Sequence, residues 1–140
     1  MDKAKADLVN EWLIKARHDL ASAEKLASGP DPYLDTAIFH CQQAAEKAVK
    51  AFLVFQDRRF EKTHDVAKLI KMAASLKKEL SLLLPEAAFL TPYASQFRYP
   101  DECLGPDRPE FDRALFAARK IYDTVLSLLP PPPSLNQPIE

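Results

Sequence analysis

Two short stretches of the chain combine side chains that bind anions or transfer protons. Residues 58–65 read Arg-Arg-Phe-Glu-Lys-Thr-His-Asp, and residues 98–101 read Arg-Tyr-Pro-Asp. Histidine is the usual proton donor or acceptor near neutral pH, and the planar fork of arginine fits a phosphate. Both stretches lie between predicted helices. We expect them to converge on one phosphate-sized site.

His64 has two candidate functional roles because a helix is predicted to begin beside it. Backbone N–H groups at a helix N-terminus favour an anion, so His64 is a candidate to hydrogen-bond a phosphate or sugar. The second role is proton transfer, in which His64 acts as a general acid or base. A purely structural alternative is that His64 caps its own helix or bonds a carbonyl of the preceding loop.

The second stretch predicts a contact surface for a nucleotide. Arg98 is the candidate phosphate ligand, Tyr99 offers stacking or a hydrogen bond, and Asp101 orients Arg98. The alternative is structural, with an Arg98–Asp101 pair and a packed Tyr99 fixing the turn between helices.

The middle of the chain is basic. Residues 47–78 hold nine basic and three acidic side chains, a net charge of +6, although the whole chain carries −1. Arg59 and Lys62 extend this positive field toward His64, and such a field attracts phosphate or an acidic partner. The alternative is that the lysines of residues 68–78 are simply the solvated face of a helix.

Other kinds of site are not predicted. Cys41 and Cys103 are far apart and lack zinc-site spacing, so we expect no metal. His18 and His40 share no ligand spacing with a carboxylate and are interpreted as surface or packing residues. The chain has no glycine-rich phosphate loop and no nucleophile elbow. We expect no cofactor.

The composition predicts one all-helical unit. The chain has 140 residues and two glycines, and its apolar residues recur at three- and four-residue intervals rather than alternating. We expect a single helical bundle over residues 1–129. Residues 130–140 are predicted to be a proline-rich, disordered tail. Neither a signal peptide nor a membrane-spanning run is present, which favours a soluble, cytoplasmic protein.

Helix boundaries follow from apolar periodicity and from capping residues. Long helices are predicted at about residues 5–27 and 34–55, with a shorter one after Thr63 or Asp65 as N-cap. Pro85 suits the first turn of a fourth helix, and Pro92 should kink or restart it. A loop at 99–109 precedes the last long helix. On the side of the second helix away from its apolar stripe, Glu46 and Lys50 are spaced for an ion pair.

Four segments together resemble the HEPN domain family over about residues 7 to 128. They are Ala-Arg-His-Asp-Leu at 16–20, Cys-Gln-Gln-Ala-Ala-Glu-Lys-Ala-Val-Lys-Ala-Phe-Leu at 41–53, Thr-His-Asp at 63–65 and Arg-Tyr-Pro-Asp at 98–101. The resemblance implies an all-α fold over residues 1–129, an up-and-down antiparallel four-helix bundle with an additional short helix, and a homodimer. Many small prokaryotic members act as the helical partner of a minimal nucleotidyltransferase, in a toxin–antitoxin-like or substrate-binding pair.

The resemblance also implies an alternative function, because other HEPN proteins are metal-independent ribonucleases. These carry an arginine, four to six residues and then a histidine in their later helices. Arg59 and His64 have that spacing, but between the second and third helices, and no histidine follows Arg98. The leading hypothesis is therefore a non-catalytic nucleotide-binding module, with RNA as a further ligand and no membrane contact. The alternative is a ribonuclease that uses His64 and an arginine.

Overall fold

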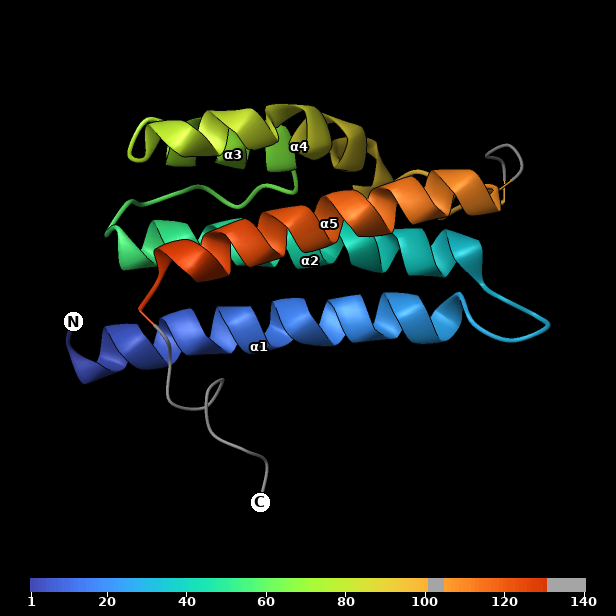
Figure 1. Cartoon of the computed structure of the whole chain (residues 1–140), viewed down its shortest axis with the longest axis horizontal. Coiled ribbons are helices and arrows are strands. Elements are labelled where there is room, and N and C mark those ends of the chain that lie inside the picture. Colours follow the sequence, from blue (N-terminus) through green and yellow to red (C-terminus); the bar gives the residue numbers. More distant parts are fainter. Residues whose placement is uncertain (101–104, 131–140) are drawn as a thin grey trace, which may run out of the picture.

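The computed structural model describes residues 1–100 and 105–130. In this part of the chain all regular structure is helical, and the all-helical bundle is confirmed. Three helices are long: α1 (Lys3–Leu26), α2 (Leu34–Phe55) and α5 (Arg108–Leu128). Figure 1 shows α1 running in the opposite direction to α2 and α5, which lie side by side. None of the helices described is both long and apolar enough to cross a membrane.

The remaining helices are short and lie on the side of α2 and α5 away from α1 (Figure 1). They are α3 (Val66–Ala74), the 3-10 helix η1 (Lys78–Leu83), α4 (Leu84–Leu90) and the 3-10 helix η2 (Thr91–Ala94). Pro85 lies in the first turn of α4, as predicted. Pro92 is the second residue of η2, which follows α4 directly, because a proline inside α4 would have no N–H for the helical ladder.

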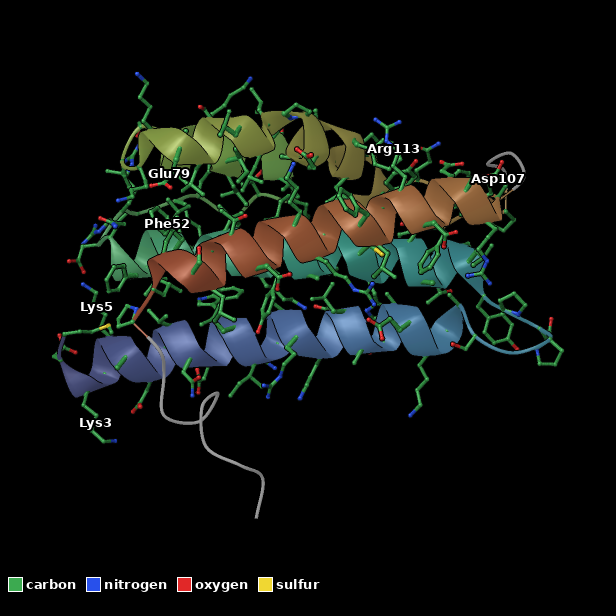
Figure 2. The ribbon with its side chains drawn as sticks, viewed as in Figure 1. Lys3, Lys5, Phe52, Glu79, Asp107 and Arg113 are labelled. Atoms are coloured by element: carbon green, nitrogen blue, oxygen red, sulfur yellow. The ribbon has the colours of Figure 1, made fainter. Side chains whose placement is uncertain are left out.

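The core is built from alanine-rich stripes of α1 and α2 on which larger side chains pack. Fully buried positions on α2 include Ala37, Ala44, Ala45 and Ala48, and these small residues allow α1 to approach closely. The largest buried side chains are Phe52 and Phe111. Figure 2 shows Phe52 on α2 and, further along the molecule, Arg113 on the side of α5 that faces α4.

An extended segment joins α2 to α3. Residues 56–65, here called the linker, turn at the end of α2 and return alongside it (Figure 1). Asp57 makes the turn with a φ of 56°, in the left-handed region that aspartate tolerates better than most residues. Lys5 reaches this turn from α1, with Nζ 2.9 Å from Oδ2 of Asp57; Figure 2 shows Lys5 pointing from α1 toward the end of α2. The linker thus covers a face of α2.

Candidate functional site

Glu46 on α2 is a buried carboxylate with partners on both oxygens. Its side chain is 4 % exposed. Oε1 accepts a hydrogen bond from Nε2 of Gln42 at 3.1 Å and lies 2.9 Å from Nδ1 of His64. Oε2 accepts from Nζ of Lys50 at 3.0 Å. The predicted Glu46–Lys50 ion pair therefore exists, but it is buried, because the linker covers this face of α2.

Two opposing effects determine the pKa of Glu46. Burial favours the protonated acid, whereas hydrogen bonds from Lys50, His64 and Gln42 favour the carboxylate, and they hold the pKa below its usual value. Because an ionised carboxylate only accepts hydrogen bonds, Nδ1 of His64 carries a proton and donates it. The His64 side chain is 71 % exposed, so its Nε2 edge is open to solvent.

Gln42 and Lys50 of α2 also contact the linker and hold it on the helix. Nε2 of Gln42 donates to the carbonyl oxygen of His64 at 2.8 Å. The Lys50 ammonium lies between two rings, 5.6 Å from the centroid of Trp12 on α1 and 5.7 Å from that of Phe60 in the linker. These cation–π contacts offset part of the cost of burying the Lys50 ammonium, whose side chain is only 9 % exposed. His64 is thus positioned by α2; the N-cap of α3 is Asp65, which accepts from the N–H of Lys68.

Arg98 lies against the opposite half of α2. Its guanidinium carbon is 4.4 Å from the centroid of the Phe39 ring, and Nη1 donates to the carbonyl of Ala94 at 3.3 Å. The two side chains border a hollow of about 290 Å³, here called the Arg98 hollow. Its lining residues are Asp35, Thr36, Phe39, His40, Phe97 and Arg98.

Two features of the Arg98 hollow were not predicted. Phe97 has a φ of 68°, in the left-handed region that bulky residues rarely occupy, and its ring stacks on Tyr93 with 6.0 Å between centroids. His40 was interpreted as a surface or packing residue, yet its Nδ1 lies 2.7 Å from Oδ1 of Asp19 on α1. Oδ2 of Asp19 accepts from Nζ of Lys47 at 2.6 Å, so this buried carboxylate has partners on both oxygens.

A sequence signal for Asp19 does exist. Asp19 falls between Ala16 and Ala23 on the stripe of α1 that packs against α2, where a charged side chain needs a partner. No sequence signal gives the identity of that partner, because His40 and Lys47 are distant in the sequence.

The remaining candidate residues are spread over the surface. Arg59 lines a second hollow, of about 580 Å³, with Val54, Asp57, Arg58 and Phe60 at the turn of the linker. Lys62 and Tyr99 are exposed and make no side-chain hydrogen bond or ion pair within the described ranges. Asp101, predicted to orient Arg98, lies outside the described residues, as does Cys103.

The two predicted stretches meet the same helix at different turns. His64 contacts Glu46 whereas Arg98 lies over Phe39, seven residues earlier on α2, or roughly 10 Å along the axis. Phe39, Gln43 and Glu46 follow at helical intervals and form one stripe that joins the two contacts, and Lys50 continues this stripe beyond Glu46. Within residues 1–100 and 105–130, no three His, Cys, Asp or Glu side chains gather as a metal site would require.

The fold is an all-helical bundle whose second helix carries a polar and aromatic stripe. Comparison with known proteins shows the family to which a chain with this fold belongs. The family model described as HEPN domain matches residues 9–128, so the chain belongs to the HEPN family. No protein of curated function matches it.

Two solved structures resemble the chain over most of their lengths. TT1696 from Thermus thermophilus has 32% sequence identity and a TM-score of 0.72, covering 86% of this chain and 98% of that one. ST0689, an archaeal HEPN homologue, has 29% identity and a TM-score of 0.66, covering 86% and 96%.

Proposed function

We propose that this HEPN protein is a nucleotide-binding module that works as a homodimer with a nucleotidyltransferase partner. The observation that carries the proposal is the Arg98 hollow, in which a guanidinium stacks on Phe39 and a second ring, Phe97, lines the same space. Aromatic faces hold a nucleobase, and an arginine fork holds a phosphate. At about 290 Å³, the hollow fits part of a nucleotide, since whole-ligand pockets are typically ~300–1,000 Å³.

The direct test is a thermal-shift screen of the purified protein against ATP, GTP, UTP, CTP and a short single-stranded RNA. RNA integrity is read on a gel from the same wells. The proposal predicts a rise in melting temperature with at least one nucleotide and intact RNA, because a ligand that binds only the folded state stabilises it. No shift with any nucleotide would contradict nucleotide binding and leave partner binding as the function.

The nucleotidyltransferase partner and the homodimer are separate parts of the proposal. Leu8 on α1 and Phe116 on α5 are exposed apolar side chains that a protein contact would cover. Sedimentation equilibrium of the protein alone should give twice the mass of one chain. Co-expression with a nucleotidyltransferase encoded beside it should give a complex that co-elutes in size exclusion; separate elution would contradict the pairing.

One observation favours the alternative, a metal-independent ribonuclease. Glu46 holds the proton on Nδ1 of His64, which leaves Nε2 facing solvent as a base. In such a reaction Nε2 takes the proton of the RNA 2′-hydroxyl, and the 2′-oxygen attacks phosphorus to form a 2′,3′-cyclic phosphate. The P–O5′ bond breaks, and the 5′-oxygen takes a proton from water. An arginine stabilises the charge on the phosphorane. Cleavage in EDTA that His64→Ala abolishes would establish this function in place of the first.

A further inference from the structure

The Arg98 hollow contains hydrogen-bond acceptors that a phosphate does not need. Asp35 and His40 line it beside Arg98. A carboxylate repels phosphate, so the cationic Arg98 is the phosphate contact and the acceptors must serve a different part of the ligand. Ribose hydroxyls are donors, and carboxylates are a common partner for them in nucleotide sites.

The contact between His40 and Asp19 determines which kind of hydrogen bond His40 offers. The carboxylate of Asp19 forms an ion pair with Lys47, whose Nζ lies 2.6 Å from Oδ2. An ionised carboxylate accepts only, hence the 2.7 Å contact places a proton on Nδ1 of His40. In a neutral imidazole with Nδ1 protonated, Nε2 is an acceptor. Because Nδ1 faces α1, the Nε2 edge is the one that remains for the hollow.

We propose that the Arg98 hollow is selective for ribonucleotides, with Nε2 of His40 and the Asp35 carboxylate accepting hydrogen bonds from ribose hydroxyls while Arg98 binds phosphate. Phe39 and Phe97 supply the apolar faces. Asp19 and Lys47 do not touch the ligand; they are positioning residues that orient His40. This inference rests on the proposed nucleotide binding and adds a preference for ribose over deoxyribose.

The test measures affinity by titration calorimetry for ATP, GTP, UTP and CTP, each beside its 2′-deoxy and 3′-deoxy counterpart. A site that bonds a hydroxyl leaves its acceptor unpaired when the hydroxyl is absent. The wild-type protein should therefore bind at least one ribonucleotide about tenfold more tightly than one of its deoxy forms. Equal affinity for all three forms would overturn the selectivity and leave nucleotide binding standing.

Two substitutions, one at residue 40 and one at a control position, separate ligand contact from packing. In His40→Asn the amide nitrogen replaces Nδ1 and keeps a donor for Asp19, but nothing replaces Nε2. We expect this variant to lose the preference for ribose while its melting temperature changes little. His18→Asn on the exposed face of α1 is the matched control and should keep the wild-type ratio. A wild-type ratio in His40→Asn would assign the selectivity elsewhere and contradict the role of His40.

Asp19→Asn tests the positioning role. An asparagine can present its N–H₂ to Nδ1, which moves the imidazole proton to Nε2 and turns that atom into a donor. We expect the ratio of ribonucleotide to deoxynucleotide affinity to fall about as far as in His40→Asn. Binding of the deoxy forms should persist, since they do not depend on this bond. If no nucleotide binds the wild-type protein at all, the proposed function fails and this inference fails with it.

Discussion

His64 Nδ1 lies 2.9 Å from Oε1 of Glu46, so a residue of the exposed linker is held by a buried carboxylate of α2. This hydrogen bond affects both residues. It orients the imidazole, and it supplies one of the hydrogen bonds that keep Glu46 ionised. The orientation of His64 is therefore coupled to the ionisation of a buried carboxylate.

Replacing Glu46 by glutamine should destabilise the protein markedly. The substitution leaves the ammonium of Lys50 buried without its countercharge, and breaking a buried ion pair in this way costs about 3 kcal/mol. The free energy of unfolding in urea at pH 7 measures the effect. Glu61→Gln removes an exposed partner of Lys68 and should leave that free energy unchanged within error. Equal effects of the two substitutions would contradict the buried network.

The contribution of the Glu46 charge to stability should depend on pH. The pKa of Glu46 is lowered in the folded state, so the unfolded chain binds more protons as pH falls below the ordinary glutamate value of about 4.3. The stabilisation by Glu46 is fully present above that value and is lost as pH falls through the lowered native pKa. The gap in stability between wild type and Glu46→Gln should narrow over this range. A constant gap from pH 7 to about pH 2 would show that the Glu46 charge is not the cause.

Gln42→Met should release the linker. The substitution removes the donor to the carbonyl of His64, one of the contacts that hold the linker on α2. Trypsin cleaves after Arg58, Arg59 and Lys62, which are all exposed in the linker. Because proteolysis follows local opening, cleavage at these sites should be several-fold faster than in wild type. Gln96→Met, at an exposed position after η2, is the control. Similar cleavage rates in all three proteins would contradict the role of Gln42 in holding the linker on α2.

Cys41 should be unreactive in the folded protein. Burial raises the pKa of its thiol to about 12, and the side chain is inaccessible on α2. In a Cys103→Ser background, Ellman's reagent should detect no thiol at mildly alkaline pH until urea is added, and then one per chain. Rapid reaction without denaturant would mean that α2 is not packed as described.

The long helices and their ends could be predicted from the sequence, because they depend on residues close together in the chain. The apolar stripe of α2 predicts a helix at about residues 34–55, and Pro85 and Pro92 mark the interruptions near α4. Thr63 and Asp65 are both predicted as N-cap of α3, and the structure selects Asp65. The 3-10 helices and the path of the linker could not be predicted, because tertiary contacts select them. For the same reason Glu46 was assigned to the open side of α2: its spacing to Lys50 gives the pair but not the linker above it.

In the candidate site, too, residue types could be predicted from the sequence, whereas contacts between helices could not. The residue type of Arg98 and its place in a loop make it a candidate, and the structure adds Phe39 and Phe97 around it. His40 gave no signal, since its partner Asp19 is 21 positions away on another helix. A contact between two helices depends on their register and crossing, which a pattern within one helix does not contain.

The measurement that tests nucleotide binding through Arg98 most directly is titration calorimetry. It compares the affinities of wild type, Arg98→Ala and Arg17→Ala for ATP, GTP, UTP and CTP. Arg17 is an exposed arginine of α1 and serves as the control. Loss of a charge-assisted phosphate contact should weaken binding about tenfold or more in Arg98→Ala alone, with the helical circular dichroism unchanged. Unchanged affinity with a lowered melting temperature would contradict the account and make Arg98 a residue that only stabilises the turn after η2.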